Sequence, residues 1–153
     1  GPLGVRVRAL ETCRTRLGAA ETGPLFRSRL HPRDAAQAIH RLLDGVRPVQ
    51  QSQIRQQLSL SLNAIVVQQL IPTSNGDGRV VAAEVLLANH AIRNHIRRDK
   101  MENLITEITL GRRQGMISIE DSLARLVRQG VISVEDETIR SSRPEALGSP
   151  LRM

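Results

Sequence analysis

The sequence predicts an α/β fold in which a β-hairpin packs against helices, and three features carry that prediction. Two apolar runs rich in β-branched residues, 64–71 and 80–88, flank a Pro-Thr-Ser-Asn-Gly-Asp-Gly segment that contains both dipeptides favoured in hairpin turns. Neither run alternates with polar residues as a strand with one wet face does, so we expect the hairpin to join a sheet covered by helices. Before and after the hairpin, apolar residues recur at helical spacing.

Two helices are expected directly before the hairpin. Asp34 suits the N-cap of a helix whose apolar residues continue on one side to Val46, and a Gln-rich helix covers about 49–62. Further upstream, the pattern predicts a helix over 10–22 and a short strand over 25–30, where arginines and a preceding proline weaken the strand pattern.

The chain after the hairpin is expected to be helical. One helix covers 91–98 and another begins near Met101 and ends near Gly115. A small repeat follows, because residues 115–121 (GMISIED) return as 130–136 (GVISVED). In each copy the glycine ends one helix, the serine caps the next, and the Glu-Asp pair lies in the first turn, so we interpret these acids as structural rather than as acid–base groups.

Composition limits the class of protein. With 153 residues, 40% of them hydrophobic, the chain is long enough for one modest domain. A net charge of +7 favours anionic partners, but the 1% aromatic content counts against base-stacking platforms for nucleic acid. Cys13 is the only cysteine, which fits a reducing, cytosolic compartment, and no apolar run reaches the roughly 18 residues of a membrane span. Residues 1–4 resemble a tag-protease scar or an arbitrary start.

The residues alone predict neither a metal site nor a cofactor site. The four histidines lack zinc-ligand spacing, and the sequence contains no nucleophile elbow and no G-x-x-x-x-G-K-[ST] loop. Glu84 stands out as an acid inside an apolar strand. An unpaired buried carboxylate is costly, so we expect Glu84 to pair with an arginine or to face a helix terminus, and we favour a structural ion pair over a role at a nucleotide.

Residues 34–147 resemble the C-terminal half of the motor domain of the PilT-like type IV pilus retraction ATPases, in the type II/IV secretion ATPase superfamily. The resemblance rests on blocks in the family's order and spacing: DAA at 34–36, QQSQIR at 50–55, QQL at 68–70, GRV at 78–80, AE at 83–84, AIRN at 91–94 with Ile96 and Arg97, and GM at 115–116. The AIRN block is similar to the motif of the retraction motors. It implies a coupling surface formed by Ala91, Ile92, Arg93, Asn94, Ile96 and Arg97.

The first 33 residues carry the resemblance with departures. Arg6 stands where the family has its catalytic glutamate and Ala9 where it has an aspartate, while Pro24 and Arg29 alter the histidine box. His31 remains as the box's second histidine and is the candidate catalytic residue. A carboxylate must orient the attacking water in ATP hydrolysis, so the resemblance implies a chain that is inactive alone.

The expected organisation follows from the resemblance. Residues 1–33 form either a degraded remnant of the Walker B and histidine-box region or a mistranslated or foreign segment. Residues 34–98 form the C-terminal half of a truncated RecA-like P-loop domain, 99–147 a helical bundle, and 148–153 a disordered tail. The family implies ATP and Mg²⁺, a hexamer, an inner-membrane pilus platform protein as partner, and a cytoplasmic position at the inner membrane. Two alternatives stay open: a catalytically dead module that assembles with intact subunits, and, less favoured, a basic helical nucleic-acid binder.

Overall fold

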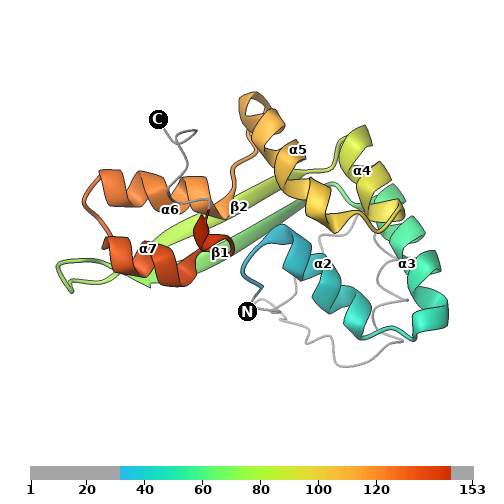
Figure 1. Ribbon diagram of the computed structural model, residues 1–153, viewed down its shortest axis with the longest axis horizontal. Coiled ribbons are helices and arrows are strands. Elements are labelled where there is room, and N and C mark those ends of the chain that lie inside the picture. The colour runs from blue at the N-terminus through green and yellow to red at the C-terminus, as the bar shows by residue number, and fades with distance from the viewer. Residues whose placement is uncertain (1–31, 146–153) are drawn as a thin grey trace, which may run out of the picture.

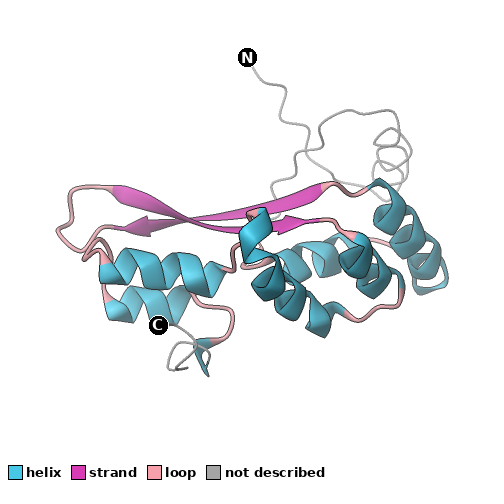
Figure 2. Ribbon diagram, turned by 90° about the horizontal axis from the view of Figure 1, so that it is seen from above, coloured by secondary structure: helices cyan, strands magenta, loops and turns pink. Residues whose placement is uncertain are grey.

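The computed structural model describes residues 32–145, and in them helices pack along one face of a long β-hairpin (Figures 1 and 2). The elements, in chain order, are α2 (Ala35–Asp44), α3 (Pro48–Ser61), β1 (Ala64–Pro72), β2 (Arg79–Leu87), α4 (His90–Arg97), η1 (Met101–Asn103), α5 (Leu104–Leu110), η2 (Gly111–Gln114), α6 (Ile119–Arg128) and α7 (Val134–Arg140). The helices α2 to α5 lie towards the open end of the hairpin, and α6 and α7 lie towards its turn (Figure 1). The predicted α/β fold is confirmed.

The hairpin has the strands and the turn that the sequence predicts. β1 and β2 pair antiparallel from Ala64 opposite Leu87 to Pro72 opposite Arg79. In the turn, Gly76 has a φ of 78° and Gly78 a φ of 155°. Residues other than glycine rarely adopt such positive φ values. The side chain of Asn75 accepts hydrogen bonds within the turn, including one from the backbone N–H of Asp77 at 3.1 Å. Glycine and asparagine therefore set the turn, as expected.

The sheet is smaller and more open than the apolar runs suggested. Within residues 32–145 it has two strands, and the helices cover only one face, here called the inner face (Figure 2). On the opposite, outer face Val66, Leu70 and Val81 are 58%, 54% and 45% exposed. Within the described residues the expected helices therefore cover one face of the hairpin, and the further strand expected over 25–30 lies outside these residues. A run of apolar residues predicts that both faces of a strand are apolar. It does not predict what packs against each face.

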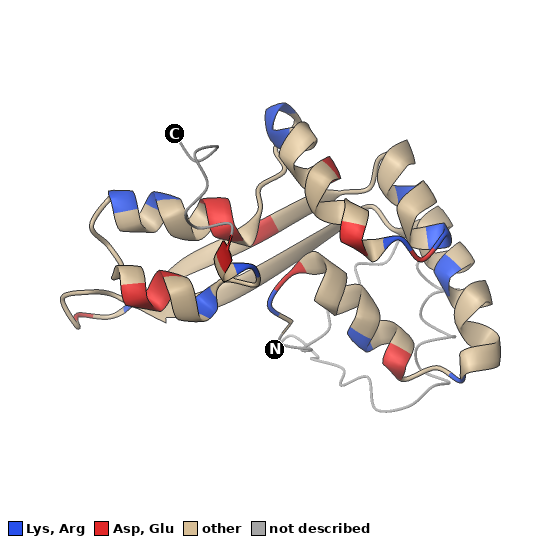
Figure 3. Ribbon diagram, viewed as in Figure 1, with Lys and Arg blue, Asp and Glu red and all other residues tan. Residues whose placement is uncertain are grey.

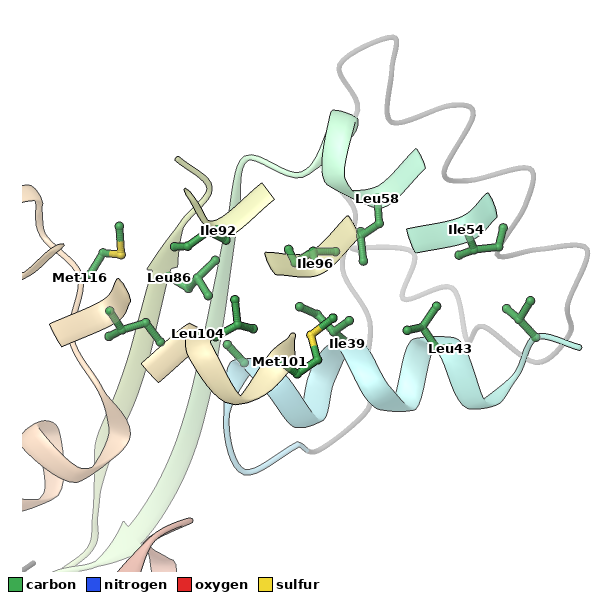
Figure 4. Close-up of a cluster of buried hydrophobic side chains, with 13 residues drawn as sticks. Ile39, Leu43, Ile54, Leu58, Leu86, Ile92, Ile96, Met101, Leu104 and Met116 are labelled. Atoms are coloured by element: carbon green, nitrogen blue, oxygen red, sulfur yellow. The ribbon is translucent and has the colours of Figure 1, made fainter. Parts of the chain in front are cut away.

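Two separate apolar cores line the inner face. The larger core joins α2, α3, α4 and α5 to Leu86 of β2, and its side chains converge between these helices (Figure 4). The smaller core joins α6 and the α6–α7 connection to the hairpin, and consists of Ile71, Ala82, Ile119, Leu123 and Ile132. We call the two parts the α2–α5 unit and the α6–α7 unit.

The helix caps expected from the sequence are present. Asp34 caps α2 by accepting the N–H of Gln37 at 2.7 Å. In the repeat, Ser118 and Ser133 cap α6 and α7, and each hydroxyl accepts an N–H three residues later at 3.1 Å. The repeat is thus one local structure used twice.

Several predictions fall on residues that the structure does not describe. The helix over 10–22, the strand over 25–30, His31 and the tail over 148–153 all lie outside residues 32–145. Among the described residues, no helix is long and apolar enough to cross a membrane.

Candidate coupling surface on helix α4

Helix α4 carries the AIRN block and is anchored firmly at its start. The side chain of Asn89 caps the helix by accepting the N–H of Ile92 at 2.9 Å. Ile92 and Ile96, four residues apart on one helix face, are both fully buried in the larger core (Figure 4). The two isoleucines of the motif therefore fix the position of α4 and are not available to a partner.

Arg93 links α4 to the end of α3. Its guanidinium Nη1 donates to the carbonyl oxygen of Ser59 at 2.7 Å and to that of Leu60 at 3.2 Å. These carbonyls belong to the last turn of α3. Carbonyl groups in the last turn of a helix have no N–H partner within that helix and carry partial negative charge. Arg93 thus caps the C-terminus of a neighbouring helix.

His95 links α4 to α5 on its other side. Its Nε2 lies 3.2 Å from Oε1 of Glu107, and both side chains are about one-fifth exposed. With Arg93 bound to α3 and His95 bound to α5, α4 is held between two neighbouring helices by polar contacts as well as by packing.

The C-terminal end of α4 is exposed and basic. Arg97, Arg98 and Lys100 are exposed, and we call these three residues the basic end of α4. At the end of α4 the N–H of Lys100 donates to the carbonyl of His95 at 2.8 Å. Asp99, just before Lys100, has a positive φ of 58°. Cations are favourable at a helix C-terminus, so the sequence stabilises the helix while presenting charge to solvent.

The structure divides the six predicted coupling residues into three groups by exposure. Ile92 and Ile96 are buried, Ala91, Arg93 and Asn94 are half-buried, and only Arg97 is exposed. Arg98 and Lys100 join Arg97 at the surface, although the motif does not include them. The sequence feature that indicates these two exposed residues is the group of cations directly after the helical pattern.

Glu84 is a buried carboxylate with two backbone partners. It is 2% exposed, its Oε2 accepts the N–H of Ala35 at 2.6 Å, and its Oε1 accepts the N–H of Ile119 at 3.1 Å. Among residues 32–145 no arginine lies within ion-pair distance of it, so the ion pair we favoured is replaced by the other arrangement, a carboxylate facing helix termini. Burial raises the pKa of Glu84 to about 7, against the opposing effect of the two backbone hydrogen bonds.

The described residues offer no evident place for a nucleotide or a metal. The N-termini of α2 and α6, where an anion would bind, are both occupied by Glu84. A pocket of about 510 Å³ lies beside Glu84, but several of its lining residues are acidic, namely Asp34, Asp99 and Glu102. No group of three or more metal-ligating side chains is found within residues 32–145.

Comparison with known proteins gives the same family as the sequence motifs. Residues 5–140 match the family described as "Type II/IV secretion system protein". The "Twitching motility protein" of Neisseria gonorrhoeae is 38% identical over 121 residues, which cover 79% of this chain and 32% of the relative. The "Type IV pilus retractation ATPase PilT" of Pseudomonas aeruginosa is 40% identical over 121 residues, 79% of this chain and 35% of the relative.

A solved structure agrees. The "Pilus Retraction Motor PilT and Bound ADP" superposes with a TM-score of 0.80 at 38% identity, over 97% of this chain and 40% of that one. The ATPase DotB of Legionella pneumophila has a TM-score of 0.69 at 21% identity and shares the fold. The chain is therefore a member of the Type II/IV secretion system protein family. Within that family it is PilT-like, and it spans about a third of the length of the curated relatives it matches.

Proposed function

We propose that this chain is part of a hexameric motor ATPase that powers type IV pilus retraction, and that the basic end of α4 is its coupling surface. The similarity to retraction motors supports the motor role. The chain would act at the cytoplasmic side of the inner membrane, where the pilus platform protein is its partner.

The observation that carries the proposal is the anchoring of α4 to both neighbouring helices. Because Arg93 binds the end of α3 and His95 lies against Glu107 of α5, a displacement of either helix is passed on to α4. The basic end of α4 would move with it. A rigid connection of this kind is what a surface that transmits motion requires.

ATP and Mg²⁺ would be bound mainly by parts of the motor outside the described residues. Hydrolysis requires phosphate-binding amides, a P-loop lysine and a carboxylate that orients water. The sequence contains no G-x-x-x-x-G-K-[ST] loop, and Arg6 stands in the glutamate's position. We infer that the chain alone does not hydrolyse ATP, while His31 would contact a γ-phosphate only in a complete motor.

A second candidate is a catalytically inactive module that assembles with intact subunits. The exposed apolar residues of the outer hairpin face, Val66, Leu70 and Val81, favour this function. An apolar face of this kind is typical of a surface that packs against another protein part.

One set of mixing experiments tests both candidates. The purified chain is assayed for ATP turnover alone, with a separately expressed N-terminal part of the Pseudomonas aeruginosa relative that extends through the family's glutamate position, so that it supplies the carboxylate that Arg6 replaces here, and with that relative intact. We expect no turnover alone and restored turnover with the N-terminal part. If turnover falls when the chain joins intact subunits, the inactive module is favoured. Turnover by the chain alone contradicts both candidates.

The coupling surface needs its own variant. Arg97→Ala combined with Arg98→Ala removes two exposed cations from the basic end of α4, and the matched control is Arg113→Ala, an exposed arginine on η2. In the reconstituted motor we expect unchanged ATP turnover but lost retraction for the α4 variant only. Equal retraction in both variants contradicts the assignment of the surface.

A further inference from the structure

Glu84 lies at the boundary between the two packing units. Along the inner face of β2, Ala82 belongs to the core of the α6–α7 unit and Leu86 to that of the α2–α5 unit. Glu84 is the residue between them on the same face, opposite Val67 of β1. A buried acid therefore separates two apolar cores that share one hairpin.

Each carboxylate oxygen of Glu84 accepts a hydrogen bond from a different packing unit. Oε2 accepts from the N–H of Ala35, the first residue of α2, and Oε1 accepts from the N–H of Ile119, the first residue of α6. Both helices have ten residues and present their positive ends to the carboxylate. One side chain thus sets the spacing between the starts of two helices that belong to different units.

Acidic residues from several elements gather near the middle of the hairpin (Figure 3). Asp34 of α2 and Glu120 of α6 both disfavour its ionised form. Arg143 lines the pocket beside Glu84, and its Nη2 lies 2.5 Å from Oε2 of Glu120. The remaining titratable groups that line the adjoining pocket come from α2 and from the segment around η1, and are His40, Asp99 and Glu102.

The two charge states of Glu84 differ in what they can bind. An ionised carboxylate offers acceptor sites on both oxygens, whereas a protonated carboxyl turns one oxygen into an O–H donor. The neutral group therefore keeps a strong hydrogen bond to one helix only. Since burial raises the pKa of Glu84 to about 7, both charge states are populated near neutral pH.

We propose that Glu84 is a proton-dependent joint between the α2–α5 unit and the α6–α7 unit. The ionised side chain fixes the starts of α2 and α6 at one spacing, and protonation releases one of the two helices. The joint rests on the contacts within residues 32–145 and does not depend on the proposed motor function.

An NMR titration of the full chain tests the joint directly. The amide resonances of Ala35 and Ile119 are followed from pH 4 to pH 9. We expect both to titrate with one shared midpoint well above the ordinary range of a glutamate, and the hydrogen-exchange protection of one amide to fall about tenfold below that midpoint. Independent midpoints, or a midpoint in the ordinary range, overturn the proposal without any variant being needed.

Two substitutions complete the test. Glu84→Gln has a neutral side chain with one acceptor oxygen, so we expect both amide titrations to disappear. Glu102→Gln removes a charge from the same pocket without touching either amide, and should leave both titrations in place. If Glu84→Gln keeps the shared titration, another group causes it and the joint is refuted.

Discussion

Arg93 Nη1 donates to the carbonyl oxygen of Ser59 at 2.7 Å, so an arginine of the proposed coupling motif caps a helix that ends thirty-odd residues earlier in the chain. An arginine in a basic helix is by default a solvated surface residue. Here the contact joins α3 to α4, and Arg97 is the one exposed residue of the motif, next to the exposed Arg98 and Lys100 that follow it.

The first prediction concerns the stability of this junction. Arg93→Ala removes a charged donor from two carbonyl groups at the end of α3, and we expect the free energy of unfolding to fall by about 2 kcal/mol. Urea denaturation followed by circular dichroism measures the change. Arg97→Ala is the matched control, because an exposed side chain away from such contacts changes stability by about 0.5 kcal/mol or less. Equal losses in the two variants would contradict the capping role of Arg93.

The second prediction concerns the pH dependence of stability. The pKa of Glu84 is about 7 in the folded chain, against an ordinary value of 4.5, so the folded state binds the proton more tightly between these limits. The contribution of Glu84 is therefore fully present below about pH 4.5 and is lost as the pH rises to about 7. A shift of this size corresponds to about 3 kcal/mol, taken as an order of magnitude.

Glu84→Gln isolates that contribution from the other titrating groups. The difference in unfolding free energy, variant minus wild type, should rise by up to about 3 kcal/mol between pH 4.5 and pH 8. Chemical denaturation at several pH values measures it. A difference that stays constant with pH would mean that Glu84 does not titrate in this range.

The sequence predicted the local structures well because their causes are local. The hairpin turn depends on Gly76 and Gly78, and the starts of α6 and α7 depend on Ser118 and Ser133, all of which act within a few residues. The buried stripe of α2 likewise follows from helical spacing.

The contacts of the site were harder to predict because they are distant in sequence. Nothing near Arg93 indicates the end of α3 as its partner, and nothing near Glu84 indicates that Ala35 and Ile119 will both donate to it. Burial of an acid limited the options for Glu84 to a cation or to helix termini. Choosing between them required the spatial arrangement of α2 and α6.

The third prediction uses the internal repeat as its own control. Glu120 and Glu135 occupy the same position in the two copies, but Glu120 is buried and Glu135 is exposed. Glu120 accepts hydrogen bonds from the N–H groups of Ser142 and Arg143 and pairs with the Arg143 guanidinium, so it fastens the segment after α7 to the start of α6.

Glu120→Ala should therefore leave a partly buried arginine and two amides without their acceptor. We expect a loss of about 3 kcal/mol in unfolding free energy and faster hydrogen exchange at Ser142 and Arg143. Glu135→Ala should change neither quantity by much, because its side chain is exposed. A small effect of Glu120→Ala would show that this segment is held by other contacts.

The fourth prediction concerns the outer face of the hairpin. Val66 is 58% exposed, so a charged residue fits there without a change in the cores. We expect Val66→Lys to reduce binding to the N-terminal part of the Pseudomonas aeruginosa relative at least tenfold, because burying an unpaired ammonium against apolar groups is costly. Sedimentation velocity of the mixture measures binding. Val134→Lys, on a similarly exposed valine of α7, is the matched control and should bind as the wild type does. If both lysine variants bind as well as the wild type, the outer face does not pack against the N-terminal part of the proposed motor.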